Sequence, residues 1–346
     1  MYYRRQLPIM SGVYRSLPTR RFVMMTMGGY WPVIDKLPNG HLGVVTRDGD
    51  FHVGARGRLV FVTSPDGGES WSHATVISQE GSDSRNPAFG VTADGTLLAS
   101  FIRQVNYKDG VIDASLGLPT PLYISRSDDN GATWDTSLAK VDGKDSCPVS
   151  SPFGRMITLA DGTVLMTYYY ASAVYIIRSH DGGHTWVDPV EIAGGGYNET
   201  SICDLGGDRL LVLMRDNEPG AVSQSDSQDG GYTWSKPRLL TGPAEHPADV
   251  IKLQDGRLLM TYGRRVTPWG ILGMLSDDDG KTWNTESRIM LVADNGTDHG
   301  YPSNVQRDDG TIVTVYYSSE LHIPRRPRPE VMGIHGAAVH YRPEDL

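Results

Sequence analysis

Apolar and polar residues alternate with a period of two along most of this chain, in short runs separated by glycine-containing turns. In six stretches an alternating apolar run enters a two-residue turn and a second apolar run follows, which is typical of a β-hairpin. Helical periodicity is negligible. The six turn glycines, spaced 45 to 67 residues apart, are Gly40, Gly95, Gly162, Gly207, Gly256 and Gly310.

A second pattern, Ser-x-Asp-x-Gly-x-(Thr/Ser)-Trp, alternates with these hairpins and includes five of the seven tryptophans. The Asp-x-Gly core is typical of a tight turn, because Asp bonds nearby backbone and Gly accepts a positive φ. The Trp is expected to fold back beneath the turn and be buried. We therefore expect these aspartates to be architectural. The five copies begin at Ser64, Ser127, Ser179, Ser227 and Ser276.

Six inner hairpins, five of them followed by an outer hairpin, make a four-stranded unit that repeats at roughly 50 residues. This repeat predicts an all-β fold, a six-bladed β-propeller of four-stranded antiparallel blades. The sixth blade requires RRFVMMTM near the N-terminus and GAAVHYR near the C-terminus to share one sheet, which covers the edge strands. We expect residues 1–346 to form a single propeller domain.

The formal net charge of −9 and pI near 5.5 argue against nucleic acid and acidic membranes as partners. No apolar run approaches transmembrane length, and residues 1–10 lack the apolar core of a signal peptide. We expect a cytoplasmic protein, or a secreted one if a leader was removed before this numbering. Cys147 and Cys203 make no disulfide framework, and no spacing suggests a metal site, so no cofactor is expected.

Charged and aromatic side chains are concentrated just before and after the inner hairpins, at the mouth of the predicted propeller. Arginine binds carboxylates through paired hydrogen bonds, and aromatic rings offer flat faces to sugars. Such a ring of side chains suits a small, hydroxylated, anionic molecule, and we expect a carbohydrate partner. Its members include Tyr30, Arg47, Asp50, His52, Arg85, Glu199, Arg215, Arg264, Arg265 and Tyr301.

The Ser-x-Asp-x-Gly-x-Thr-Trp pattern resembles the Asp-box of the sialidase (neuraminidase) superfamily of six-bladed propellers, and the repeat covers essentially the whole chain. The segment NETSICDLGGDRLLVLMRDN resembles the sialidase segment in which a Glu precedes an inner strand and an Arg follows sixteen residues later. Those residues are Glu199 and Arg215 here. The segment beginning GYPSN resembles the one that carries the nucleophilic tyrosine, which is Tyr301.

The resemblance implies an exo-acting retaining hydrolase that removes a terminal acidic sugar, sialic acid or a related one, and needs no cofactor. Tyr301 would be the nucleophile and Glu199 would take its proton. Asp50, or second Asp48, would be the acid that protonates the leaving oxygen. The residues that would bind the substrate are Arg215, one of Arg264 and Arg265, Arg47, Arg85 and His52.

The chain departs from the superfamily pattern in blade one. Tyr30-Trp31-Pro32-Val33 stands where sialidases carry an Arg-Ile-Pro sequence, so one carboxylate-binding arginine is missing, and Arg47 is the candidate substitute. His52 is not part of the sialidase pattern either. A His beside a Tyr also suits a polysaccharide lyase acting on uronate-containing glycans, and a non-catalytic carbohydrate-binding propeller is a third alternative.

Overall fold

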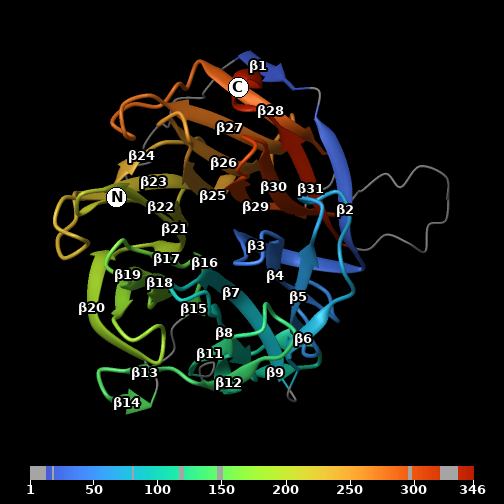
Figure 1. Ribbon diagram of the computed structural model, residues 1–346, viewed down its shortest axis with the longest axis vertical. Helices are drawn as coiled ribbons and strands as arrows, with labels where there is room; N and C mark the ends of the chain where they lie inside the picture. Colours follow the sequence, from blue (N-terminus) through green and yellow to red (C-terminus); the bar gives the residue numbers. More distant parts are fainter. Residues whose placement is uncertain are drawn as a thin grey trace.

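The computed structural model describes residues 13–17, 19–79, 82–116, 121–145, 151–294, 298–319 and 334–346. Six β-sheets are arranged as blades around a central axis (Figure 1), which confirms the predicted all-β six-bladed propeller. Over these residues the only helices are two single 3₁₀ turns, Ala114–Leu116 and Pro343–Asp345. No helix there is long and apolar enough to cross a membrane. The N-terminal residues 1–10 and Cys147 lie outside the described residues.

In four of the six blades the main strands follow one another in the chain from the axis outward, as antiparallel neighbours. Blade one consists of β3 (Gly28–Lys36), β4 (Leu42–Asp48), β5 (Arg58–Ser64) and β6 (Thr75–Ser78), and the main strands of blade two are β7 (Asp83–Val91), β8 (Leu97–Gln104), β11 (Leu122–Ser127) and β12 (Asp135–Leu138). Blade four consists of β21 (Tyr197–Gly206), β22 (Arg209–Asp216), β23 (Ala221–Ser227) and β24 (Arg238–Leu239). The main strands of blade five are β25 (Glu245–Lys252), β26 (Leu258–Arg264), β27 (Gly270–Ser276) and β28 (Ser287–Ala293).

Blade three differs because its inner strand is broken into pieces. Pro152 has no amide to donate to a ladder, and Gly154 has a φ of +76°, so the strand cannot run continuously. One piece leaves the blade and pairs in parallel with β7 of blade two. The strands here are β15 (Ser151–Pro152), β16 (Gly154–Arg155), β17 (Ile157–Thr158), β18 (Val164–Tyr170), β19 (Ala173–Ser179) and β20 (Thr185–Ala193), with β13 (Lys140–Val141) and β14 (Lys144–Asp145) at the outer edge.

Blade six closes the ring by joining both ends of the chain. It contains β29 (His299–Gln306), β30 (Ile312–Ser318) and β31 (His335–Tyr341), and its outer strand is β2 (Arg20–Thr26), which pairs antiparallel with β31. The two chain-end segments expected from the sequence therefore share this sheet. An additional strand, β1 (Val13–Ser16), pairs in parallel with β28, so the N-terminal segment spans the seam between blades five and six.

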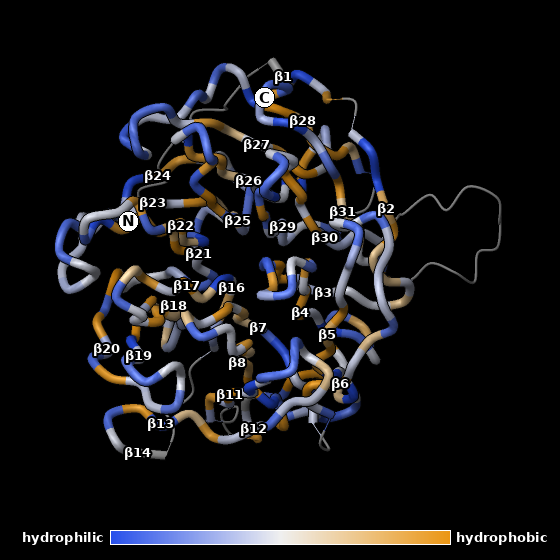
Figure 2. Tube along the Cα trace, in the orientation of Figure 1, coloured by the Kyte–Doolittle hydropathy of each residue, from blue (hydrophilic) through white to orange (hydrophobic). Residues whose placement is uncertain are grey.

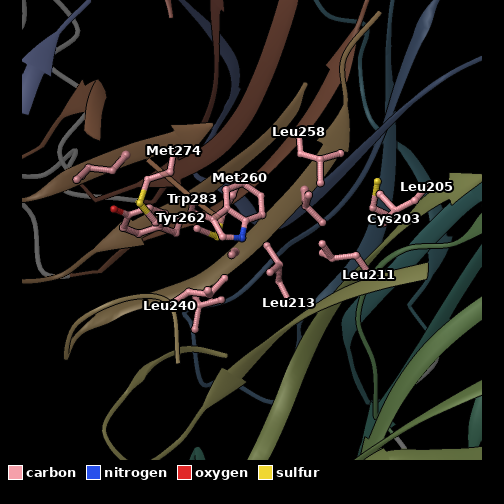
Figure 3. Packing of buried hydrophobic residues seen from close by; sticks show 14 of the residues in the cluster. Cys203, Leu205, Leu211, Leu213, Leu240, Leu258, Met260, Tyr262, Met274 and Trp283 are labelled. Carbon is pink, nitrogen blue, oxygen red and sulfur yellow. The ribbon is translucent and has the colours of Figure 1, made fainter. Parts of the chain in front are cut away.

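The hydrophobic core consists of layers between neighbouring blades rather than one central mass. Six clusters of buried residues each join two adjacent blades around the ring. The apolar segments lie within the blades and the polar ones at their ends (Figure 2). Between blades four and five, Leu211 and Leu213 pack against Leu258, Met260 and Trp283 (Figure 3). Each sheet face is therefore covered by a neighbouring blade, and strands such as β4 and β30 are buried at every position.

The repeated turn is stabilised by its own side chains, as blade four shows. Ser227 Oγ accepts the Gly231 amide at 2.8 Å and donates to Asp229 Oδ1 at 2.8 Å. Asp229 also accepts the Thr233 amide at 2.9 Å and the Thr233 hydroxyl at 2.6 Å. The Trp234 indole donates to the Gly231 carbonyl at 3.1 Å. The Trp thus folds beneath its own turn, and the Asp is fully engaged in holding that turn.

All five repeated turns lie on one face of the propeller, because each follows the third strand of its blade. Neighbouring strands in a blade are antiparallel, so the first and third strands run in the same direction and both end on the face with the turns. The beginnings of the inner strands therefore lie on the opposite face. Tyr301 in β29 and Glu199 in β21 are near such beginnings, so they are separated from the Asp turns by the length of a strand.

The Asp turns should make stability depend on pH below pH 4. Hydrogen bonds from Thr133 lower the pKa of Asp129 to about 2, and those from Thr233 do the same for Asp229. An unfolded Asp titrates near ~3.9, so this stabilisation is complete above that pH and is lost as pH falls toward the folded value. We expect the free energy of unfolding, measured by urea denaturation, to fall between pH about 4 and about 2. Asp229→Asn should show a smaller fall than wild type, and an identical fall would contradict this.

Candidate active site

The inner strands share a β-bulge near the face that carries Tyr301. In five blades one extra residue enters the ladder at the same place, where the pairing register shifts. A bulge bends the strand and re-aims its side chains, and bulges are frequent next to active sites. Two residues of each bulge have no partner in the ladder, and the first of the two is Trp31, Asn86, Asn198, His246 or Tyr301 in the five blades.

The second position of this bulge distinguishes blade four. It is proline in the other four bulged blades, which fits a site where no ladder amide is needed. In blade four the same position is Glu199, so an ionisable side chain replaces the proline that shapes the strand in the other bulged blades. An X-Pro dipeptide at the start of four inner hairpins, replaced by Asn198-Glu199 in a fifth, was therefore a sequence signal for the site. The four prolines are Pro32, Pro87, Pro247 and Pro302.

Tyr301 and Glu199, 102 residues apart in the chain, form a hydrogen bond at the mouth. The Tyr301 hydroxyl donates to Glu199 Oε1 at 2.6 Å. Arg215 Nη1 donates to Glu199 Oε2 at 2.8 Å and lies 3.4 Å from the Tyr301 hydroxyl. Tyr301 and Glu199 are buried, whereas the Arg215 side chain is 26% exposed. Blades four and six thus bring a phenol, a carboxylate and a guanidinium together.

The electrostatics of this group keep the Tyr301 phenol protonated. Burial and the Glu199 carboxylate raise the pKa of Tyr301 far above its usual value, and Arg265 and Arg215 oppose that rise only in part. A phenol in this state becomes nucleophilic only as its proton moves to an acceptor. Glu199 Oε1 is already in position to take that proton, because it accepts the Tyr301 hydrogen bond.

Aromatic rings surround Tyr301 on several sides. Its ring centroid lies 5.6 Å from that of Tyr317, 5.7 Å from that of Phe153 and 6.3 Å from that of Trp31. Both Trp31 and Tyr301 adopt a positive φ, +51° and +53°, a strained backbone that the bulges hold in place. Tyr30 stands where the resemblance places an arginine, and its ring packs against Tyr317 with centroids 5.3 Å apart, so an aromatic ring replaces charge at that position. We call Trp31, Phe153, Tyr301 and Tyr317 the aromatic cage.

The neighbouring residues Arg265 and Arg264 place their guanidinium groups in different surroundings. Arg265 lies 5.4 Å above the Tyr301 ring, and its Nη1 donates to His246 Nδ1 at 3.2 Å. Arg264 pairs with Glu245, whose side chain is 1% exposed and also binds Arg288 at 2.8 Å. Of the two arginines, Arg265 is at the cage and Arg264 is part of a buried ion network.

Substituting these two arginines should separate binding from stability. Arg265→Ala should raise KM for an acidic substrate about 10- to 100-fold, the loss of one charge-assisted hydrogen bond. Arg264→Ala should lower the free energy of unfolding by about 1.5–3 kcal/mol, because Glu245 loses one of its cationic partners. Steady-state kinetics and urea denaturation of both variants test this. The reverse assignment of effects would contradict it.

The structure does not support a substrate-binding role for Arg47. Its side chain is completely buried and binds Asp83 at 2.6 Å. Its other nitrogens donate to the carbonyls of Phe51, at 2.8 Å, and Gly54, at 3.1 Å. Arg47 therefore holds the loop that follows β4 in place. Its guanidinium has no face left for a substrate carboxylate, which the alternating pattern could not reveal.

The structure does not support Asp50 as a proton donor either. Its two carboxylate oxygens accept the amides of Phe51, at 2.9 Å, and Arg56, at 3.0 Å. Burial favours a higher pKa for Asp50, but these amides and the Arg56 charge hold it below the usual value. Asp48, the second candidate, forms a bidentate ion pair with Arg58 at 2.6 and 3.0 Å. Both aspartates are thus occupied by their own loop.

Arg85 lies at the edge of the cage. Its guanidinium carbon is 4.8 Å from the centre of the Trp31 ring, and its Nη1 contacts Asp83 at 3.3 Å and Tyr107 at 3.2 Å. Stacking between a guanidinium and an indole fixes both groups. Arg85 therefore positions Trp31 and remains a candidate for substrate contact.

Sequence reasoning missed Asp298 as a partner of His52. His52 Nδ1 lies 3.1 Å from Asp298 Oδ1, which also accepts the Tyr317 hydroxyl at 2.8 Å. The His52 ring packs edge-on against Trp31, with centroids 5.2 Å apart. The two residues are 246 positions apart in the chain. The only sequence signal for this pairing was that Asp298 lies three residues before Tyr301.

Below the cage, a buried ion network crosses the axis. Arg155 donates to the Asn304 carbonyl and to Asp35 at 3.4 Å, and lies 3.8 Å from Asp249. Burial raises the pKa of Asp35 and of Asp249, and the Arg155 charge opposes this. These residues come from four different blades, so they tie the centre of the ring together. In the part of the chain that the structure describes, no group of three or more His, Cys, Asp or Glu is arranged to hold a metal ion.

Comparisons with known proteins agree with this architecture. Solved structures with the same fold include a protein of unknown function from Dyadobacter fermentans, with 22% identity and a TM-score of 0.77 over 94% of this chain and 100% of that one. The Hadza microbial sialidase Hz136 has 21% identity and a TM-score of 0.72, over 93% of this chain and 67% of that one. The NanB sialidase from Streptococcus pneumoniae has 13% identity and a TM-score of 0.70, over 95% and 71%.

At these identities the solved structures establish the fold alone. No curated protein sequence matches the chain. A family model described as BNR repeat-like domain matches residues 46–314, well over half of the chain. The predicted six-bladed propeller is confirmed as the fold, and the predicted BNR-type repeat is confirmed by the family model. The chain belongs to the BNR repeat-like domain family.

Proposed function

We propose that the protein is a retaining glycoside hydrolase that cleaves a terminal acidic sugar. The observation that carries this proposal is the hydrogen bond of 2.6 Å from the Tyr301 hydroxyl to Glu199, with Arg215 beside both. A neutral phenol is a suitable nucleophile at an anomeric carbon that bears or adjoins a carboxylate, because it avoids charge repulsion. Tyrosine nucleophiles of this kind are an exception to the usual carboxylate pair.

In the first step the Tyr301 oxygen attacks the anomeric carbon as its proton moves to Glu199 Oε1. The bond to the leaving oxygen breaks, and that oxygen gains a proton from a general acid. In the second step water attacks the anomeric carbon and gives a proton to the group that acted as the general acid. The bond to Tyr301 breaks, and Tyr301 recovers its proton from Glu199. The stereochemistry is retained because two inversions occur.

Charge and ring contact near Tyr301 support an acidic glycone. Arg215 is partly exposed beside the nucleophile, and Arg265 lies over its ring. Two guanidinium groups can bind one carboxylate through charge-assisted hydrogen bonds. Trp31 and Phe153, both buried, pack beside Tyr301 and give the nucleophile apolar surroundings.

A product assay on a panel of glycans tests this function. We would incubate the protein with 4-methylumbelliferyl glycosides of N-acetylneuraminic acid and of glucuronic and galacturonic acids, in both anomers, and follow the products by NMR. Retention of anomeric configuration in the first product formed is expected. An inverted first product, or no turnover of any acidic glycoside, would overturn the proposal.

The His52–Asp298 pair favours one second candidate, a lyase acting on uronate-containing glycans. An imidazole oriented by a carboxylate can remove the proton α to a uronate carboxylate. Tyr301 would then protonate the leaving oxygen. A lyase makes an unsaturated uronate that absorbs in the ultraviolet, so the same assay on polyuronates separates the two reactions.

A further inference from the structure

The proposed hydrolysis needs a proton donor for the leaving oxygen, and the described residues near the cage offer few. The carboxyl groups of Asp50 and Asp48 are occupied by backbone amides and by the Arg58 ion pair, as described above. His246 accepts a hydrogen bond from Arg265 at Nδ1, and burial and the charges of Arg215 and Arg265 lower its pKa to about 3. His246 is therefore neutral and has no proton to give at Nδ1.

Asp298 is also unsuited to give a proton itself. Burial works to raise the pKa of Asp298, but hydrogen bonds from His52 and Tyr317 and the charge of Arg265 hold it below the usual value. As a carboxylate that accepts both bonds, Asp298 instead orients what donates to it. The Tyr317 hydroxyl fixes one of its oxygens from within the cage, at 2.8 Å.

From this geometry we infer that His52, oriented by Asp298, is the general acid and base of the proposed hydrolysis. Asp298 holds the tautomer with the proton on Nδ1, since Nδ1 lies 3.1 Å from Oδ1 and 3.3 Å from Oδ2. Nε2 is thereby the atom that exchanges protons with a substrate. The side chain is 37% exposed, and no described residue hydrogen-bonds to Nε2.

The aromatic cage places His52 and the nucleophile around a shared space. The Trp31 ring contacts both, with centroids 5.2 Å from His52 and 6.3 Å from Tyr301. Tyr317 also contacts both, at 6.4 Å and 5.6 Å. Because both side chains contact the same two rings, a sugar whose anomeric carbon is at Tyr301 would have its leaving oxygen toward His52.

With His52 as the acid and base, every proton lost in one step is recovered in the other. As the glycosidic bond breaks, His52 Nε2 gives its proton to the leaving oxygen and becomes neutral. When water later attacks the anomeric carbon, His52 Nε2 takes a proton from that water and is restored. Asp298 stays a carboxylate throughout, so Asp298 is a positioning residue and His52 a catalytic one.

The inference rests on the proposed function and is tested by dependence on the leaving group. We would compare wild type with His52→Gln on the 4-nitrophenyl and methyl glycosides of the acidic sugar that the panel identifies. A methyl leaving group needs a proton and 4-nitrophenolate does not. His52→Gln should lower kcat/KM, which reports only the first step, about 10²- to 10⁴-fold for the methyl glycoside and less than about 10-fold for the 4-nitrophenyl glycoside. Asp298→Asn should shift the same ratio in the same direction by a smaller factor.

Asp50→Asn is the matched control from the same loop and should keep the wild-type ratio of the two rates. The inference is overturned if His52→Gln lowers both rates equally, or neither, while Tyr301→Phe abolishes both. It is also overturned if Asp50→Asn alone changes the ratio. If wild type cleaves no glycoside with retention, the proposed function itself fails, which is a separate outcome.

Discussion

Replacing Tyr301 with phenylalanine should reduce kcat for an acidic glycoside by about 10⁴-fold or more, the scale seen when an enzyme loses its nucleophile. The substitution removes only the hydroxyl oxygen. The ring remains packed against Phe153, Trp31 and Tyr317, so the cage should stay intact. Steady-state kinetics on the aryl glycoside from the panel would measure the loss.

Stability provides the control for Tyr301→Phe. The variant leaves Glu199 bonded to Arg215, so the carboxylate keeps a charged partner. We expect the midpoint of urea denaturation to stay close to wild type, because the only bond lost is the one to Glu199. Turnover within about 10-fold of wild type would rule out Tyr301 as nucleophile, since general effects of a lost hydroxyl are no larger.

Glu199→Gln should reduce kcat by about 10²- to 10⁴-fold, the usual contribution of a general base. Glutamine keeps the size of the side chain and a carbonyl oxygen that accepts the hydrogen bond from Tyr301. It cannot take the proton that Tyr301 must lose. The defect should therefore appear in kcat more than in KM, even though Arg215 loses an ion pair at 2.8 Å.

Arg264→Lys offers a comparison for Glu199→Gln. It changes a buried ion pair of similar kind, with Glu245, that lies in blade five and away from the phenol. We expect it to affect stability and leave kcat near wild type. If Glu199→Gln behaves like Arg264→Lys, then the Glu199 carboxylate is structural and does not act as a base.

The fold was predictable because its signals are local and repeated. Alternating residues and a turn glycine such as Gly40 or Gly256 mark each hairpin in the sequence, and in each repeated turn the Ser hydroxyl bonds the Asp and the Gly of the same turn. Two features of the fold were not predicted. Pro152 and Gly154 break the inner strand of blade three. β1 joins blade five by a parallel pairing, which the hydrophobic periodicity does not indicate.

The site was predictable only in part. Tyr301 and Glu199 were found through resemblance, and the structure brings them within 2.6 Å. The roles of Arg47 and Asp50 depended on where each side chain finds its partners, which period-two patterns do not encode. The pairing of His52 with Asp298 joins blade one to the loop before blade six, so it exists only after the ring has closed.

Trapping the covalent intermediate tests the central claim most directly. A glycosyl fluoride of the acidic sugar identified by the panel, with a second fluorine on the carbon next to the anomeric carbon, forms the enzyme adduct and slows its breakdown. Mass spectrometry of proteolytic peptides should then find the sugar on the peptide that contains Tyr301, and no adduct should form on Tyr301→Phe. An adduct on a different residue, or steady hydrolysis by wild type with no adduct, would contradict the account.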